Sequence, residues 1–292
     1  MSALKVVKKF KTQKECIEFL EKRRWKNGVE CPYCKSTKTS IHNEEGRTSR
    51  HQCQSCQKSF SVLVGTIFEA SKLPLVKWFI AIALIIEAKK GLSSLQLSRN
   101  IDVTYKTAWF LSHKIRKALE EKNPALFGGV VELDETYVKT TKDDDDDKKG
   151  GGKMGRGTNN TAVFGIANKG GDIKAFAVED TKSHTLLELT MQSVEIGTEL
   201  HTDEYKSYKC FKHYYAHKTV FHKREYVSAE GITTNSIEGF WSLLKRGIKG
   251  NFHHISKKYL QAYINEFSYR YNARKIDNNT VFEDIIGRLL GC

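Results

Sequence analysis

The sequence lacks an apolar run long enough to cross a membrane. A membrane-spanning helix needs about 18–20 consecutive apolar residues, and the longest candidate, residues 78–86, has about half that length. The first ten residues also lack the apolar region and the cleavage site of a signal peptide. We therefore expect a protein without a membrane partner, located in a reducing cytoplasm.

The sequence has fewer acidic than basic residues. The 292 residues include 34 Asp and Glu against 48 Lys and Arg, which gives a net charge of +14. One run of five aspartates, at residues 143–147, holds part of that acidity, so the remaining surface is more basic than the total indicates. Such a charge favours a polyanionic partner, although ribosomal and membrane-surface proteins carry it too.

Cysteine, in contrast, follows a pattern. Four of the seven cysteines form two C-x-x-C pairs, Cys31 with Cys34 and Cys53 with Cys56. This spacing is typical of a zinc site with four thiolate ligands, so we predict structural Zn²⁺ on these four residues. Disulfides and a thioredoxin-like redox pair are the alternatives, and a reducing compartment disfavours the disulfides.

The segment that follows the cysteines reads as helices. Helical spacing covers residues 75–89, 91–100 and 105–119, with a turn at 101–104. A short helix, a turn and a basic second helix predict a helix-turn-helix. The residues of this segment that we expect to face DNA are Tyr105, Lys106, His113, Lys114 and Arg116. The alternative is a plain helical bundle whose basic face is only solvated.

Strand signals dominate from residue 124 onward. Strands are predicted at residues 130–138, 161–168, 172–179 and 199–202. The glycine turn at 169–171 is typical of a hairpin, and helices are expected at 183–194 and after residue 234. This order predicts an α/β fold with a mixed sheet, as in ribonuclease-H-like proteins. Residues 139–160, which contain the aspartate run and several glycines, are predicted to be a disordered loop.

Three acidic side chains are candidates for a divalent-metal site. Asp134 and Asp203 each end a predicted strand, and adjacent central strands would place them side by side. Glu238 comes from the later helix. Phosphodiester transfer develops charge on two oxygens, which two Mg²⁺ ions about 3.5–4 Å apart stabilise when carboxylates hold them. We predict that these acids bind Mg²⁺ or Mn²⁺; the alternative is that the aspartates are ordinary surface carboxylates.

The later helix, with the sequence TNSIEGFWSLLKR, carries further polar groups. Asn235, Glu238 and Lys245 lie three and seven residues apart, so they project from one face. Lys245 is expected to hold a DNA phosphate near the metals. Arg246 and Lys249 would extend the basic, DNA-binding surface.

Four motifs together resemble one family. They are VELDETY at 131–137, HTDEY at 201–205, TNSIEGFWSLLKR at 234–246 and HHISKKYL at 253–260. They resemble DDE-type insertion-sequence transposases with an N-terminal zinc ribbon, the bacterial relatives of eukaryotic Merlin elements. The resemblance implies a ribonuclease-H-like catalytic core, Mg²⁺-dependent cleavage at terminal inverted repeats, and strand transfer into target DNA. In that family the third catalytic position is acidic in some groups and asparagine in others, so both Glu238 and Asn235 remain candidates.

The resemblance also sets the expected organisation and partners. The expected parts are an N-terminal amphipathic helix region, a zinc ribbon, a helical DNA-binding domain and a ribonuclease-H-like catalytic domain, over residues 1–27, 28–65, 66–123 and 124–292. The partner is double-stranded DNA, at the terminal repeats and at the target, and joining two ends requires a homodimer or a larger assembly. A bacterial nucleoid, or a eukaryotic nucleus, is the expected location.

Two other functions fit parts of the pattern. One is a domesticated, non-catalytic DNA-binding regulator, which would keep the ribbon and the helix-turn-helix without using the acids. The other is a nuclease or resolvase on the same fold, which the carboxylates alone do not distinguish from a transposase.

Overall fold

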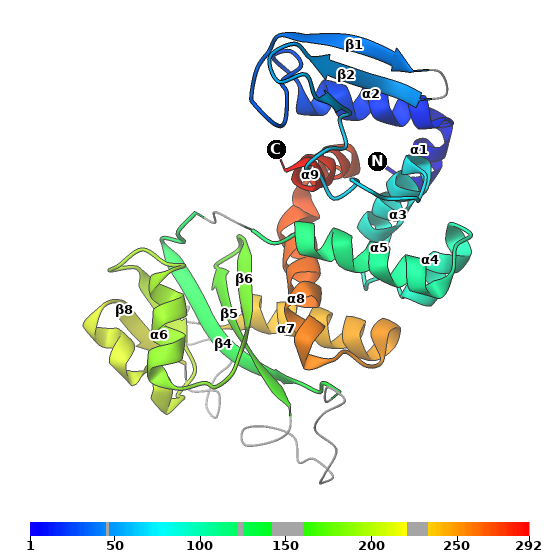
Figure 1. Cartoon of the computed structure of the whole chain (residues 1–292). Coiled ribbons are helices and arrows are strands. Elements are labelled where there is room, and N and C mark those ends of the chain that lie inside the picture. The colour runs from blue at the N-terminus through cyan, green and yellow to red at the C-terminus, as the bar shows by residue number, and fades with distance from the viewer. Residues whose placement is uncertain (45–46, 122–124, 142–159, 221–232, 292) are drawn as a thin grey trace. The chain divides into compact units, whose positions relative to one another are not determined.

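The computed structural model describes residues 1–44, 47–121, 125–141, 160–220 and 233–291 (Figure 1). Its contacts divide the chain into two units, Met1–Leu119 with Ile276–Cys292, and Glu120–Lys275. Most of the predicted loop at 139–160 lies outside the described residues. Within the described part of the chain, no helix has the length and apolar character needed to span a membrane.

The first unit begins with two helices and a small sheet. These elements are α1 (Ala3–Lys9), α2 (Gln13–Arg24), β1 (Thr39–Glu44), β2 (Arg47–Cys53) and β3 (Ser59–Phe60). The three strands pair antiparallel in the order β1-β2-β3. Helix α2 starts at a capping box in which Thr12 and Glu15 satisfy each other's backbone N–H groups.

Four helices complete the first unit. They are α3 (Leu75–Glu87), α4 (Ser94–Asn100), α5 (Tyr105–Ala118) and α9 (Asn278–Leu290). Phe282 of α9 is fully buried and packs on Phe10 and Phe79, with ring centroids 6.4 and 5.7 Å apart. The sequence-based boundary assigned residues 276–292 to the catalytic domain; this boundary is wrong, because the apolar face of α9 is buried in the first unit.

The second unit is built on a five-stranded mixed sheet in the order β6-β5-β4-β7-β8. Its strands are β4 (Val130–Val138), β5 (Thr161–Asn168), β6 (Ile173–Val178), β7 (Glu199–Thr202) and β8 (Ala216–Thr219). The pairs β4–β5 and β5–β6 are antiparallel, whereas β4–β7 and β7–β8 are parallel. The predicted mixed-sheet, ribonuclease-H-like α/β class is confirmed.

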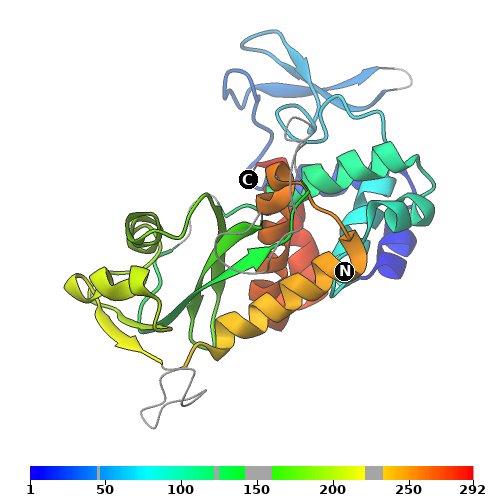
Figure 2. The same ribbon diagram turned by 90° about the horizontal axis from the view of Figure 1, so that it is seen from below.

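Helices cover both faces of this sheet. One face packs on α6 (Ser183–Met191) and the 3-10 helix η1 (Lys206–His213) through Leu186, Tyr208 and Phe211. The opposite face packs on α7 (Asn235–Gly247) and α8 (Lys257–Asn272). Figure 2 shows α6 and the pair α7 and α8 on opposite sides of the sheet. The central strand β4 is therefore buried on both faces, and its polar residues face helices.

Candidate functional site

Strand β4 separates its apolar and acidic side chains by alternation. Val131 and Leu133 belong to the core on the α6 face. Successive side chains of a strand point to opposite faces, so Glu132 and Asp134 face α7. Glu135 points away from that face, because its carboxylate accepts a hydrogen bond from the buried Tyr208 hydroxyl at 2.7 Å. The α7 face of β4 is thus the acidic one.

The two aspartates occupy matching positions on neighbouring parallel strands. Val131 pairs with Leu200, and Glu132 pairs with His201. If this pairing is extended by two residues along both strands, Asp134 lies opposite Asp203. Asp203 is the first residue after β7. The negative charge of Asp203 contributes to a raised pKa at Asp134, which fits this proximity. The structure brings together the two acids that the sequence singled out, but only Asp203 lies at a strand end, because β4 continues to Val138 and Asp134 is in its middle.

The half-buried Asp134 is closely surrounded by protein atoms. Burial raises the pKa of its carboxyl to about 8, and the charges of Glu135 and Asp203 act in the same direction. Two donors oppose this shift: the indole Nε1 of Trp241, which donates to Asp134 Oδ2 at 2.9 Å, and the backbone N–H of Glu135. A carboxylate that burial makes hard to ionise gains strongly from a divalent cation, which neutralises its charge.

A glycine on the neighbouring strand makes room for this indole. Gly165 of β5 pairs with Asp134. A Cβ atom at residue 165 would lie 2.5 Å from Ile237 Cδ1 and 2.5 Å from Trp241 Cζ2, which is well inside van der Waals contact. Glycine is therefore required here for α7 to approach the sheet closely enough for Trp241 to reach Asp134.

The residues in and after α7 that were predicted for the site are half-buried or exposed to solvent. Glu238 is half-buried, and its Oε1 accepts from the Thr234 hydroxyl at 2.8 Å. The other predicted residues of this segment are exposed: Asn235, Lys245, Arg246 and Lys249. Among the described residues, the four cysteines alone bring three or more metal-binding side chains within 4.8 Å of one another. The carboxylate of Glu238 is therefore not gathered that closely with both aspartates.

Two residues at the site were not identified from the sequence. Glu132 is buried and accepts hydrogen bonds from the backbone N–H groups at the start of α7. His201, also buried, accepts from the Thr233 N–H. One available signal is their position, because each lies two residues before an aspartate and so on the same face of its strand.

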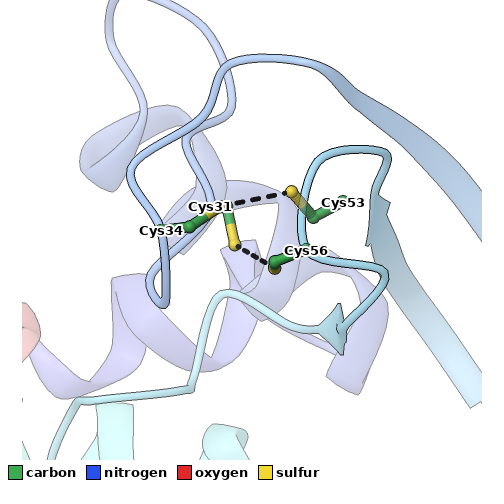
Figure 3. Close-up of side chains that lie close together, drawn as sticks. All are labelled: Cys31, Cys34, Cys53 and Cys56. Carbon is green, nitrogen blue, oxygen red and sulfur yellow. Dashed lines mark hydrogen bonds between the residues drawn. The ribbon is translucent and has the colours of Figure 1, made fainter.

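The four predicted zinc ligands converge in the first unit (Figure 3). Cys31 Sγ lies 3.7 Å from Cys56 Sγ, and Cys34 Sγ lies 3.5 Å from Cys53 Sγ. A tetrahedral zinc ion with Zn–S bonds of about 2.3 Å sets its sulfurs about 3.8 Å apart, whereas a disulfide requires about 2.05 Å. The arrangement fits a four-thiolate zinc site and excludes the disulfide alternative.

Both cysteine pairs adopt the same tight turn. The N–H of Lys35 donates to Cys31 O at 2.9 Å, and the N–H of Gln57 donates to Cys53 O at 3.0 Å. Lys35 and Gln57 have φ angles of 62° and 59°, the left-handed conformation that such turns require.

Helices α4 and α5 have the predicted helix-turn-helix spacing. Thr104 caps α5 by accepting from the Thr107 N–H, and Tyr105 and Lys106 at its start are exposed. Lys114 is half-buried and donates to Ile67 O at 3.2 Å.

Arg116 does not have the exposure that the sequence analysis expected. It is 1% exposed, so the prediction that it faces DNA is wrong. Ala108, Ser112 and Arg116 recur every four residues and all lie on the inward face of α5.

Comparison with known proteins gives family matches over both units. Residues 126–272 match the family described as ISXO2-like transposase domain, and residues 11–59 match the transposase zinc-ribbon domain. An uncharacterized protein in transposable element ISH50 of Halobacterium salinarum is 29% identical over 279 residues, which cover 90% of this chain and 92% of that protein.

Solved structures give more distant likenesses. A pre-cleavage Mos1 transpososome matches with a TM-score of 0.26 and 10% identity, over 73% of this chain and 75% of that one. The Mos1 strand transfer complex matches with a TM-score of 0.24 and 10% identity, over 71% and 76% of the two chains. At such scores the likeness does not by itself establish a common fold.

Proposed function

Because this chain belongs to the ISXO2-like transposase family, we propose that it cleaves DNA at the terminal inverted repeats of its element and joins the ends to target DNA, using divalent metal ions. One observation carries the proposal. Asp134 within β4 and Asp203 directly after β7 occupy matching register positions on neighbouring parallel strands, and Asp134 contacts α7 through Trp241.

These two carboxylates would hold Mg²⁺ or Mn²⁺. The bound metal would stabilise charge on the attacking and leaving oxygens of the phosphodiester. The chain's own contribution is a pair of oxygen ligands, Asp134 within β4 and Asp203 directly after β7, and the first is oriented by the indole of Trp241.

Glu238 is our choice for the third acid. Its carboxylate is half-buried and oriented by the Thr234 hydroxyl, whereas Asn235 is exposed and its side chain has no such support. A third negative charge also neutralises two divalent cations better than an amide does. Glu238 would close on the metal together with the aspartates when the ions bind.

The ribbon would bind one structural zinc ion through Cys31, Cys34, Cys53 and Cys56. The Sγ separations and the matched turns support this ligand set. The bound ion would link the two turns and fix the fold of the ribbon, in whose described residues Phe60 is buried together with Cys31 and Cys53.

DNA contacts are proposed for both units. In the first, the exposed start of α5, with Tyr105 and Lys106, would enter a groove of the terminal repeat, and Lys114 would contact a phosphate. In the second, Lys245, Arg246 and Lys249 would follow the DNA backbone. The helical DNA-binding part would comprise residues 66–119 together with α9, and synapsis of two ends would require at least a homodimer.

An assay of cleavage and joining tests the proposal. Purified protein is incubated with a labelled duplex of the element's own terminal repeat, a target plasmid and Mg²⁺, in parallel with Asp134→Ala. We expect metal-dependent cleavage and joining that the substitution abolishes. Binding of the repeat without any cleavage would instead support a domesticated DNA-binding regulator.

A further inference from the structure

The two residues that precede the aspartates by two positions both contact the start of α7. Glu132 lies on β4 and His201 on β7, and they pair directly in the parallel register. Each therefore shares a face with its aspartate. Their partners are consecutive parts of one segment, Thr233 before the helix and Ser236 and Ile237 in its first turn.

Glu132 supplies the cap that α7 does not provide for itself. Its Oε2 accepts from the Ser236 N–H at 2.8 Å and from the Ile237 N–H at 3.2 Å, and its Oε1 accepts from the Ser236 hydroxyl at 3.2 Å. The first N–H groups of a helix lack partners within the helix, and the N-terminus attracts negative charge. A fully buried carboxylate thus satisfies two backbone donors on a different element.

This cap changes what the helix's own N-cap residue does. Thr234 makes no side-chain capping bond to the helix, and its hydroxyl instead donates to Glu238 Oε1 at 2.8 Å. Capping by Glu132 thereby leaves the Thr234 hydroxyl to orient the carboxylate proposed as the third acid. The Glu132 contact and the orientation of Glu238 are linked through one turn of helix.

His201 holds the residue just before this turn. Its Nδ1 accepts from the Thr233 N–H at 3.3 Å, while its Nε2 bonds to Glu199 Oε1 at 2.8 Å. The Thr233 hydroxyl in turn accepts from the Asn235 N–H at 3.0 Å. The chain therefore enters α7 along a path fixed by both central strands.

We propose that Glu132 is a positioning residue, assisted by His201, which fixes the first turn of α7 so that Glu238 and Trp241 meet Asp134 in one geometry. The inference rests on the proposed function, because it concerns the same metal-binding acids. Glu132 and Asp134 are separated by one residue of a rigid strand, so the cap and the metal ligand move as one body. Small displacements matter in such a site, since a shift of about 1 Å can slow chemistry by about 100-fold.

The test compares Glu132→Gln and Glu132→Ala with wild type in the full-length protein. Glu204→Gln is the matched control, because Glu204 is an exposed acid next to Asp203 that is outside the α7 contacts. Single-turnover cleavage of the terminal repeat at saturating duplex and the Kd for that duplex are measured separately. Hydrogen exchange of the backbone amides at residues 236 and 237 gives a readout that needs no activity.

We expect Glu132→Ala to slow cleavage by about 100-fold with an unchanged Kd, and to remove the protection of both amides. Glu132→Gln should slow cleavage less, because one oxygen can still accept, and Glu204→Gln should behave like wild type. Full cleavage in Glu132→Ala would overturn the proposal, as would slow cleavage with both amides still protected. If Glu132→Ala fails to fold, His201→Gln and Glu132→Gln provide the same comparison.

Failure of the proposed function has a different signature. Wild-type protein would then show no metal-dependent cleavage, while loss of amide protection in Glu132→Ala would still establish the contact with α7. Mn²⁺ binding measured by calorimetry would in that case decide the positioning role. An unchanged Mn²⁺ affinity in Glu132→Ala would overturn it.

Discussion

The indole N–H of Trp241 donates to Oδ2 of Asp134 at 2.9 Å, joining residues 107 positions apart in the sequence. This bond fixes the carboxylate on the central strand to the helix that carries Glu238. It occupies one lone pair of Oδ2. Trp241 is therefore both a core residue and the orienting partner of a proposed metal ligand.

Trp241→Phe removes this donor while retaining an aromatic ring. We expect cleavage of the terminal repeat to fall by about 10-fold or more, since hydrogen bonds to charged groups are worth about 1.5–3 kcal/mol. Trp78→Phe is the matched control, because Trp78 Nε1 donates to Ser71 Oγ at 3.1 Å in the other unit. That control should lose some stability and keep its cleavage rate at saturating DNA. Equal rates for Trp241→Phe and wild type would contradict an orienting role.

Gly165→Ala tests the close approach of α7 to the sheet. The added methyl would overlap Ile237 and Trp241, so we expect a loss of about 1–3 kcal/mol in the free energy of unfolding. At Gly239 of α7, by contrast, an added Cβ atom would have no neighbouring atom within 4 Å. Gly239→Ala should therefore stabilise the helix by about 0.5–1 kcal/mol. Urea titration of both variants checks the contrast, and equal effects would argue against the tight packing.

The raised pKa of Asp134 predicts a pH-dependent stability in metal-free buffer. The folded protein retains the Asp134 proton up to about pH 8, whereas the unfolded chain loses it near 3.8. Stability should thus fall as pH rises from about 4 to 8, relative to Asp134→Asn, which does not titrate. Mg²⁺ or Mn²⁺ should reverse this loss in wild type. Thermal unfolding at several pH values measures the change in stability. If the stability of wild type and of Asp134→Asn depends on pH in the same way, the raised pKa of Asp134 is contradicted.

Removal of zinc should unfold the ribbon. We expect one tightly bound zinc ion per chain. A Cys53→Ser variant should contain far less zinc, because its three remaining thiolates cannot complete the tetrahedral coordination of the ion. Elemental analysis and Co²⁺ substitution spectra report the ion and its sulfur ligands. A protein purified with no metal and with disulfides in the ribbon would contradict the site.

Phe282→Ala should destabilise the first unit. Its ring is fully buried against Phe10 and Phe79, so we expect a loss of about 3–5 kcal/mol. Limited proteolysis should then cut the first unit earlier, while fragments of the second unit persist. Preferential cutting within residues 160–220 would show that α9 stabilises the other unit instead.

The sequence was most informative where structure is local. The predicted strands at 130–138, 161–168 and 199–202 have the same bounds as β4, β5 and β7. Apolar runs bounded by turn residues indicate both the type of element and its ends. The cysteine spacing led directly to the four convergent thiols. The motifs around Asp134 and Asp203 led to the family, which the match over residues 126–272 confirms.

Features that depend on distant contacts were missed. Strand β8 is short and carries His217 and Lys218, so no apolar alternation marks it. Arg116 is basic and reads as a surface residue, yet its helical position turns it inward. The roles of Glu132 and Trp241 depend on how α7 docks on β4, which a single sequence does not encode locally.

The most direct test of the central claim is a metal-specificity measurement on Asp203→Cys. If Asp203 binds the catalytic metal, a thiolate in its place should abolish repeat cleavage in Mg²⁺, which requires oxygen ligands, and permit partial cleavage in Mn²⁺, which accepts softer ones. Asp203→Ala should be inactive in both metals. Cleavage by Asp203→Cys in Mg²⁺ at the wild-type rate would contradict the assignment of Asp203 as a metal ligand.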